Sequence, residues 1–421
     1  MGQEGKIVIV NKTRSKMIQT FSNQDQMATW DFQKEIQPNH SSSNKVEWSE
    51  KVWPWFDKSK DHGEVGYKLD NNKNIKISLW NAKERNILVE LWGFDGPGSS
   101  TSYRLAWQKD SDMFATIEEK TVDLKKWMDG INPTTPINKL CIPGTHDSLT
   151  FEPSGFVSAA FAEKSARAQY ANASIDQQLY YGCRYLDLRI NEDLDGCHGI
   201  VNCKNGLEYA ISKIHNFLDN FRSETVFVRI KNDRTISDWG KFEKNMDDLI
   251  RKHQSIFWKN NTAIKWPYEW PTLNDVKGKL IVIDSLDEGP NGTRYFCGKG
   301  YGYKYNQKID VQLGDEKQMG IFAPQDEYKA PNENYKLKEI KDNINLPYDA
   351  SVMKLNHVSA TGTAAGAFGL GWTPKDYADY LNPKVTSYLI EKGTSCTTGI
   401  IAFDFIDESI GKVVVNCNKF D

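Results

Sequence analysis

The first hundred residues alternate apolar and polar side chains over short runs that turn-forming residues separate. Between residue 6 and about residue 108 these runs are KIVIV, YKLD, NIKISLW, NILVELW and YRLAW. Alternation sends successive side chains to opposite faces of a strand, so the pattern predicts antiparallel strands with one buried face. The DNNKN segment tolerates turn conformations and predicts a hairpin. We therefore expect a compact β-sandwich with Trp80, Trp92 and Trp107 in its core.

The pattern changes near residue 120, where TVDLKKWMDGI predicts a helical segment. Beyond it, apolar runs alternate with longer polar or amphipathic stretches such as LEYAISKIHNFLDNF, whose apolar residues have helical spacing. The apolar runs are KLCIP, RYLDLRI, TVFVRIK, KLIVID, GIFAP, VMKLNHV and GIIAFDFI. Near-continuous apolar strands separated by helices predict an α/β fold, a (β/α)8-type (TIM) barrel with room for irregularity. The expected domains are a sandwich over residues 1–120 and a barrel over residues 121–421.

Length and charge bring in two constraints. The 421 residues suffice for two cores, and 53 basic against 56 acidic residues give a formal charge of -3. Such a balance provides no broad attraction for nucleic acid, so any phosphate chemistry depends on locally placed charge. No apolar run reaches about 18 residues, which predicts no spanning helix. The opening MGQEGKIVIVNKT lacks the features of a secretory signal, so we expect either an internal protein or a sequence that begins after cleavage.

Cysteine usage argues against a structural zinc site. The count is odd and no Cys-x-x-Cys spacing occurs, so we expect isolated buried thiols. Cys197 and Cys203 are close enough in sequence to bridge a short loop. The seven are Cys141, Cys183, Cys197, Cys203, Cys297, Cys396 and Cys417.

Polar side chains stand where the predicted barrel strands end, and in this fold those ends share one mouth. Two histidines among them can act as general base and general acid, an arginine can grip a phosphate, and a carboxylate can orient an imidazole. The remaining histidines, His40, His62, His215, His253 and His357, are expected at the surface or satisfied in the core. The candidates are His146, Asp147, Asp187, Arg189, His198, Lys231, Asp326, Tyr328 and Asp404.

Several of these residues lie in ordered motifs that resemble a known family. IPGTHDS, SIDQQLYYGCRYLDLRI, CHG, ETVFVRIK, PQDEYK and IIAFDFI follow one another from about Leu124 to the end. In this order they resemble the catalytic domain of bacterial-type phosphatidylinositol-specific phospholipase C. The resemblance implies cleavage of phosphatidylinositol at a membrane surface, through attack of a neighbouring hydroxyl that yields diacylglycerol and a cyclic inositol phosphate.

The resemblance also implies a role for each candidate. His146 corresponds to the base that deprotonates the inositol 2-hydroxyl, and His198 to the acid that protonates the leaving diacylglycerol oxygen. Asp404 corresponds to the carboxylate that orients His146, Asp147 to the aspartate beside that base, and Arg189 to the phosphate-gripping arginine. The headgroup contacts correspond to Lys231, Asp326 and Tyr328.

Charge suggests that no metal or other cofactor is needed. Calcium-dependent relatives place acidic ligands where this chain has Arg189 and, nearby, Lys231, and fixed cations there would repel calcium. Asp187 is expected to pair with Arg189, or to remain from a ligand set. Where the bacterial family places an arginine against inositol, this chain reads Asp284-Ser285 with no basic residue before Arg294, which leaves the preferred headgroup open.

Two other readings remain open. One is a metal-dependent glycerophosphodiester phosphodiesterase-like enzyme, and the other is a non-catalytic inositol-lipid-binding protein. IVIVNKT, GYKLD and ISLWN resemble small lipid-binding sandwiches of the aegerolysin kind, although a purely structural sandwich with aromatic core strands explains them equally well.

The barrel rim is a candidate for membrane contact. Residues 366–372 (GAFGLGW) are apolar, and Phe151, Phe156 and Phe161 follow the first candidate loop, so we expect either peripheral contact with a membrane or loops packed on the barrel. A monomer is expected. The resemblance implies secretion, and a cytoplasmic location is the alternative.

Overall fold

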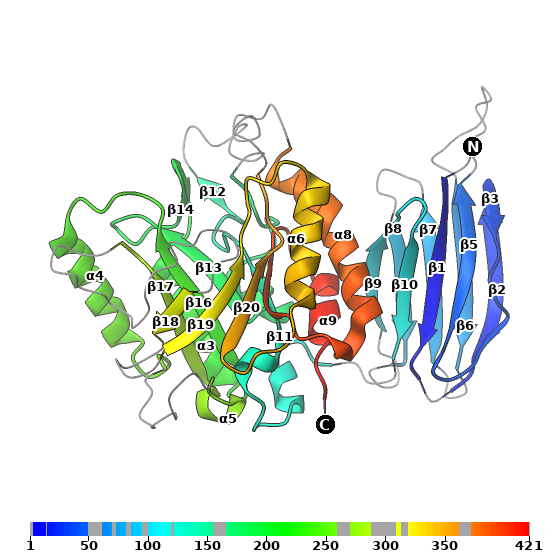
Figure 1. The fold of residues 1–421 in the computed structure, drawn as a ribbon, viewed down its shortest axis with the longest axis horizontal. Coiled ribbons are helices and arrows are strands. Elements are labelled where there is room, and N and C mark those ends of the chain that lie inside the picture. The colour runs from blue at the N-terminus through cyan, green and yellow to red at the C-terminus, as the bar shows by residue number, and fades with distance from the viewer. Residues whose placement is uncertain are drawn as a thin grey trace. The chain divides into compact units, whose positions relative to one another are not determined.

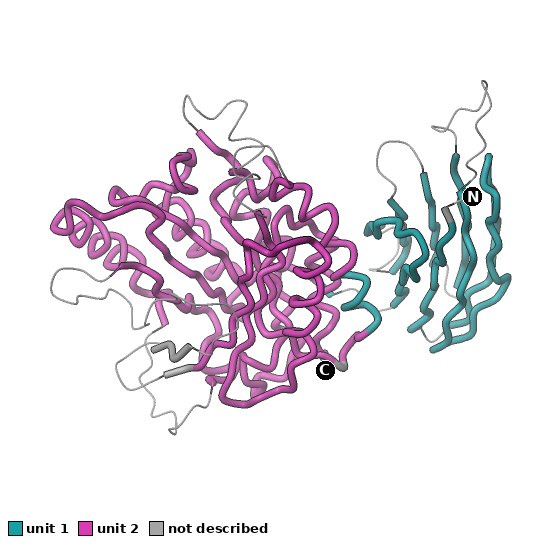
Figure 2. The backbone as a smooth tube through the Cα atoms, turned by 45° about the horizontal axis from the view of Figure 1, so that its top comes forward, with its two compact units in different colours: residues 1–122, 386–391 teal, residues 123–385, 392–421 magenta. Residues whose placement is uncertain are grey.

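The computed structural model describes residues 3–13, 15–48, 61–69, 73–80, 86–94, 100–118, 122–154, 166–258, 270–287, 309–312, 319–361 and 372–420. It divides into two compact units, residues 1–122 with 386–391 and residues 123–385 with 392–421 (Figure 2).

The first unit is a β-sandwich, as predicted. Its four-stranded sheet has the order β10-β1-β5-β3 and its six-stranded sheet the order β4-β2-β6-β7-β8-β9. One apolar cluster joins residues of both sheets, including Ile7 and Val46 from the first and Ile77 and Val89 from the second. The strands are β1 (Gln3–Asn11), β2 (Met17–Asp25), β3 (Met27–Trp30), β4 (Glu35–Ile36), β5 (His40–Trp48), β6 (His62–Lys68), β7 (Asn74–Trp80), β8 (Asn86–Trp92), β9 (Ser100–Ala106) and β10 (Asp112–Ile117).

Alternating burial along these strands accounts for the sandwich. In β8, Ile87, Val89 and Leu91 are buried while the residues between them are partly exposed. The predicted hairpin joins β6 to β7, with Lys68 opposite Asn74. One pairing departs from the antiparallel expectation, because β1 runs parallel to β10. Trp107 is buried as expected, whereas Trp80 is 43% exposed and stacks on His62.

The second unit contains a curled eight-stranded sheet of order β17-β16-β13-β11-β21-β20-β19-β18. The strands from β11 to β17 follow one another along one half of this sheet and those from β18 to β21 along the other, and the first strand, β11, pairs with the last, β21. This arrangement confirms the predicted irregular (β/α)8-type barrel. Every described pairing is parallel except that of β18 with β19. The strands are β11 (Cys141–Thr145), β13 (Tyr185–Ile190), β16 (Thr225–Asn232), β17 (Lys279–Ser285), β18 (Ile309–Gln312), β19 (Met319–Gln325), β20 (Val352–His357) and β21 (Gly399–Phe403).

Helices cover the outside of this sheet, with α6 packed on β19 and β20 and α9 on β11 (Figure 1). Amphipathic spacing explains the coverage: α3 buries Leu207, Ile211 and Ile214 on one stripe. The helices are α2 (Ile175–Tyr180), α3 (Leu207–Asn220), α4 (Trp239–Lys252), α5 (Leu273–Val276), α6 (Glu333–Asn345), α8 (Pro374–Lys392) and α9 (Glu408–Val415).

The remaining elements are short. The segment predicted as helical at the boundary forms only a 3-10 turn, and no helix in the described part of the chain is long and apolar enough to cross a bilayer. These elements are η2 (Trp127–Gly130), η3 (Ile137–Lys139), η5 (Gly393–Ser395) and the small sheet of β12 (Pro153–Ser154), β14 (Cys197–His198) and β15 (Val201–Cys203).

Candidate active site

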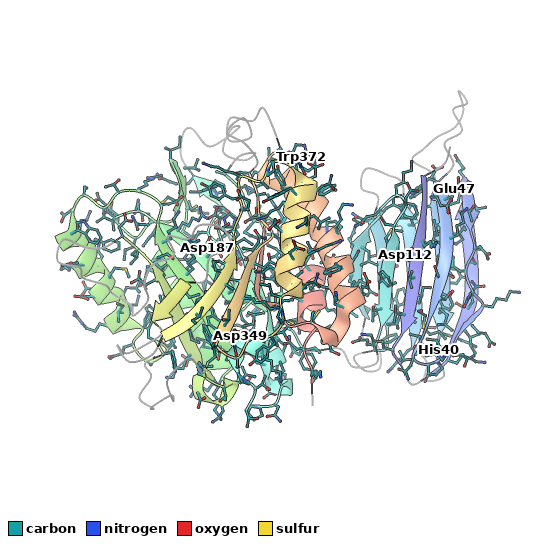
Figure 3. All side chains as sticks on the ribbon, in the orientation of Figure 1. His40, Glu47, Asp112, Asp187, Asp349 and Trp372 are labelled. Atoms are coloured by element: carbon teal, nitrogen blue, oxygen red, sulfur yellow. The ribbon has the colours of Figure 1, made fainter. Side chains whose placement is uncertain are left out.

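Parallel strand ends bring the candidate residues to one end of the barrel. His146 and Asp147 directly follow β11, and Asp404 directly follows β21, its neighbour in the sheet. Asp187 and Arg189 point the same way from β13, since residues two apart on a strand share a face (Figure 3 labels Asp187). Gly144 allows the close approach of β11 to β13, because a Cβ there would lie 2.7 Å from the Cβ of Tyr185.

The contacts of His146 define its tautomer. Its Nε2 lies 2.7 Å from Nη2 of Arg189, and because a guanidinium can only donate, Nε2 carries the lone pair. Its Nδ1–H then donates to Oδ1 of Asp404 at 2.8 Å. Burial and the adjacent Arg189 charge hold the pKa of His146 well below its ordinary value. The imidazole is therefore neutral, with Nε2 as its basic nitrogen.

Two buried side-chain amides hold the backbone at His146 and at Asp404. The Gln169 side chain donates to the carbonyl of His146 at 2.7 Å and to that of Phe403 at 3.0 Å. Asn382 donates to the carbonyl of Asp404 at 2.8 Å. Burial, reinforced by the nearby Asp147 charge, raises the pKa of Asp404 well above its ordinary value. The Gln169 side chain thus links the segment that carries His146 to the segment that carries Asp404 through hydrogen bonds to their backbone carbonyls.

His198 faces His146 across the carboxylate of Asp147. One oxygen of this group, Oδ2, lies 3.4 Å from Nε2 of His198 and 3.7 Å from Nε2 of His146. The Nδ1 atom of His198 lies 3.0 Å from the carbonyl oxygen of Ala166, to which it donates. With Nδ1 protonated and Nε2 beside a carboxylate, His198 is suited to carry a second proton and act as an acid.

Arg189 lies beside His146 and is surrounded by carboxylates. Its Nε pairs with Asp147 and lies 3.3 Å from Oδ2 of Asp187, while Nη1 lies 3.7 Å from Oδ1 of Asp233. Burial alone would lower the pKa of Arg189, but Asp147 and Asp187 outweigh it and raise the pKa above its ordinary value. The guanidinium is a permanent, oriented positive charge.

A second guanidinium stabilises Asp187, as Arg229 from β16 donates to its Oδ1 at 3.1 Å. Burial would raise the pKa of Asp187, yet Arg229 and Arg189 outweigh it and hold the pKa well below its ordinary value. The expected pairing of Asp187 with Arg189 is therefore present, with Arg229 as an additional partner.

The headgroup candidates lie around this centre with different exposure. Lys231 donates to Oδ1 of Asp233 at 2.8 Å, and Asp326 directly follows β19. Tyr328 is 48% exposed, as a stacking platform requires. At the position of the expected arginine, Ser285 accepts a hydrogen bond from Nε of Arg229 at 3.1 Å; Arg294 lies outside the described residues.

Three residues of the site were not predicted from the sequence. Asp233 accepts a hydrogen bond from the Gly199 amide at 2.6 Å. Burial would raise the pKa of Asp233, but the charges of Arg189 and Lys231 outweigh burial and lower the pKa to about 2. Arg229 was the second omission, although Arg229, Lys231 and Asp233 are spaced two apart, a signal that they share a face. His357 was expected to be uninvolved, but its buried ring lies edge-on to that of His146 with centroids 5.6 Å apart.

Two expectations outside the centre can be compared with the structure. Of the two alternatives for Phe151, packing on the barrel is supported and membrane contact is not, because Phe151 is 3% exposed and packs near Tyr209; Phe156, Phe161 and residues 366–371 lie outside the described part. The described cysteines are free thiols, but the expectation that they are isolated is wrong for Cys141, Cys396 and Cys417, which are in contact.

Three residues of this centre are of the types that bind a metal cation. Among the described residues, His146, Asp147 and Asp187 offer ligand atoms that all lie within 4.8 Å of one another. Arg189 pairs with both carboxylates of this set and contacts the histidine, so a metal ion would have to displace it. As arranged, the charge that a divalent cation would supply comes from the guanidinium.

The fold and this centre together define a β/α-barrel protein with a paired-histidine and arginine site at its strand ends. Residues 144–285 match the family model for the phosphatidylinositol-specific phospholipase C, X domain. Over these residues the chain resembles that family.

Bacterial relatives cover most of the chain. It is 29% identical over 312 residues to 1-phosphatidylinositol phosphodiesterase of Listeria monocytogenes, covering 72% of this chain and 88% of that protein. The Staphylococcus aureus (strain Newman) protein of the same name is 22% identical over 298 residues, covering 66% and 87%. The solved phosphatidylinositol-specific phospholipase C from Listeria monocytogenes aligns with a TM-score of 0.56 and 27% identity, over 71% of this chain and all of that one.

Proposed function

We propose that this protein cleaves phosphatidylinositol to diacylglycerol and myo-inositol 1,2-cyclic phosphate without a metal ion. The observation that carries the proposal is the arrangement of His146 and His198 on one Asp147 oxygen with Arg189 beside them. Two proton-transfer groups and one fixed cation are what an internal displacement at phosphorus requires. The relatives named above supply the substrate class.

In the proposed reaction, His146 takes the proton of the inositol 2-hydroxyl at Nε2. The phosphate draws the Arg189 guanidinium off this nitrogen, and the lone pair then becomes available. The hydroxyl oxygen attacks phosphorus, and His198 gives its Nε2 proton to the departing diacylglycerol oxygen. Because nucleophile and phosphorus belong to one substrate, the enzyme needs no nucleophile of its own.

The remaining candidates have supporting roles in this proposal. Asp404 keeps the proton of His146 on Nδ1, and Asp147 stabilises the protonated form of either imidazole. Lys231, Asp326 and the exposed ring of Tyr328 contact the inositol, and Asp187 holds Arg189 in place.

Phosphorus NMR of phosphatidylinositol vesicles with excess EDTA tests the proposal. A cyclic phosphodiester signal should appear with the native protein and be lost in His146→Ala and His198→Ala. His40→Ala is the matched control, because His40 lies in the first unit and should leave the signal intact. Production of inositol phosphate without a cyclic intermediate, or an unaffected His146→Ala variant, would refute the mechanism.

A metal-dependent phosphodiesterase is the second candidate, favoured by the His146, Asp147 and Asp187 group. It predicts that EDTA abolishes turnover and that a divalent cation restores it. The same measurement therefore separates the two mechanisms.

We further propose the first unit as a lipid- or ligand-binding module, divided from the barrel near residue 120. Phe21 and Trp80 are exposed on it, at 37% and 43%. The full chain is proposed to act as a secreted monomer in peripheral contact with the membrane. Co-sedimentation of the full chain with vesicles tests the module: Phe21→Ala with Trp80→Ala should reduce binding but not turnover of dispersed substrate.

A further inference from the structure

Three cysteines far apart in the chain meet at the end of the barrel opposite His146. Cys141 begins β11, whose other end leads to His146, and Cys396 lies three residues before β21, whose other end leads to Asp404. Cys417 follows α9, which packs on β11. The group lies outside the proposed phosphodiesterase centre.

Hydrogen bonds place the three residues against one another. Sγ of Cys141 lies 3.5 Å from the carbonyl oxygen of Cys396 and accepts from the Thr398 amide at 3.4 Å. The side chain of Asn418, next to Cys417, accepts from the amide of Cys141 at 2.8 Å and donates to its carbonyl at 2.9 Å. Sγ of Cys396 lies 3.3 Å from the carbonyl oxygen of Gly393 and Sγ of Cys417 lies 3.4 Å from that of Val413, and both thiols are close enough to the Cys141 sulfur to change its pKa.

The surroundings favour a thiolate at the central position. Hydrogen bonds from Cys396 and Cys417 hold the pKa of Cys141 well below its ordinary value, while the same bond raises the pKa of Cys396 to about 12. The buried ammonium of Lys354 is close enough to act electrostatically on Cys141 and Cys396, and its own pKa is lowered by burial to about 8. One negative charge is thus shared by the group and centred on Cys141.

Access differs among the three sulfurs. Cys141 and Cys417 are 1% and 2% exposed, whereas Cys396 is partly exposed. A small reagent therefore meets Cys396 first, and Cys141 is the thiolate positioned to react with whatever forms there.

We propose that Cys141, Cys396 and Cys417 form a redox-active thiol site that reacts with a small-molecule disulfide, such as oxidised glutathione, and closes a reversible Cys141–Cys396 disulfide. Cys396 gives its proton to the Cys141 thiolate and, as a thiolate itself, attacks one glutathione sulfur; the glutathione S–S bond breaks, and the other glutathione takes that proton from Cys141 and leaves as a thiol. The Cys141 thiolate then attacks Sγ of Cys396, the bond from Cys396 to the first glutathione breaks, and this glutathione leaves as a thiolate that takes a proton from water. Two protein thiols are oxidised and one glutathione disulfide is reduced to two thiols.

The bond would tie the first strand of the barrel to the last. The two cysteines are 255 positions apart, and closing so long a segment restricts the unfolded chain strongly. Cys417 takes no part in the covalent step and serves as a hydrogen-bond donor to Cys141. Serine retains a donor at that position but cannot form a disulfide, and this makes Cys396→Ser and Cys417→Ser a matched pair.

The test incubates the full-length protein with oxidised glutathione and maps disulfide-linked peptides by mass spectrometry, with thermal unfolding measured before and after addition of dithiothreitol. We expect a linked Cys141–Cys396 peptide and an unfolding midpoint several degrees higher, both reversed by dithiothreitol. Cys417→Ser should behave like the native protein, and Cys396→Ser should lose both effects while it keeps phospholipase activity.

Three results would overturn the proposal. These are the absence of the Cys141–Cys396 peptide, a bridge that involves Cys417 instead, and a reversible stabilisation that persists in Cys396→Ser. Cys183→Ser, which removes a buried thiol elsewhere in the unit, controls for general effects of losing a cysteine.

Discussion

Replacement of Asp404 by asparagine tests the link between the His146 tautomer and turnover. The 2.8 Å bond requires an acceptor opposite Nδ1, and the residue at position 404 is only 2% exposed. If the new amide turns its N–H toward Nδ1, the imidazole proton must move to Nε2. There it faces Nη2 of Arg189, which is also a donor, so the basic lone pair is lost.

The size of the effect follows from what a general base contributes. Proton transfer to a positioned side chain accelerates reactions by about 100- to 10,000-fold. At 1.36 kcal/mol per tenfold change, Asp404→Asn should raise the activation free energy by about 3 to 5 kcal/mol, visible as a fall in kcat. KM should change little, because Asp404 lies behind His146.

Initial rates on vesicles and on a monomeric short-chain phosphatidylinositol provide the assay, with thermal unfolding to verify folding. Asp407→Asn is the control: Asp407 caps α9 through a 2.9 Å bond from the Ile410 amide, and asparagine caps equally well. Combining Asp404→Asn with His146→Ala should cost no more than His146→Ala alone. A kcat within tenfold of the native value, or an effect confined to KM, would show that this bond does not control the base.

Four further predictions follow from the same contacts. Since the Arg189 charge lowers the pKa of His146, Arg189→Gln should move the acid limb of the kcat/KM profile to higher pH, and an unmoved limb would contradict this. His357 is buried in its neutral form, and burial lowers its pKa to about 4, so the unfolded state binds more protons than the folded state between about pH 6.5 and 4. The free energy of unfolding should therefore fall by about 3 kcal/mol as the pH drops through this range, and urea titrations of His357→Gln should show a weaker pH dependence. Turnover should be the same after dialysis against EDTA, measured with and without added calcium. Arg184→Met should destabilise the second unit by about 3 to 5 kcal/mol in denaturant unfolding, because it leaves buried Glu224, now 2.7 Å from the guanidinium, without its partner.

The repeating patterns of the sequence were sufficient to predict both architectures. Alternation in β8 and the near-continuous apolar run of β16 reflect how many faces of each strand are buried, which is a local property. The parallel pairing of β1 with β10 and the antiparallel β18 were not predictable in this way. Those pairings depend on which distant strands meet, and a single segment carries no record of that.

The candidate centre was predictable where motifs follow strands, as for His146 and Asp404. Arg229 was missed because it lies inside the apolar run of β16, where a polar side chain looks like an isolated exception. His357 ends β20, as the other candidates end their strands, but no motif drew attention to it. Only the register, which sets Arg229 opposite Asp187, reveals its partner. The thiol group was missed for a similar reason, since Cys141 and Cys396 are brought together only by the closure of the sheet.

The adjacency of β11 and β21 also has a consequence for biosynthesis. His146 follows the first strand of the barrel and Asp404 follows the last, so the pair forms only after the 258 positions that separate them have been translated. A ribosome-bound chain that ends before β21 has no acceptor for the His146 proton. An enzyme of this kind would remain inactive toward the producing cell's own lipids until β21 and Asp404 have been synthesised.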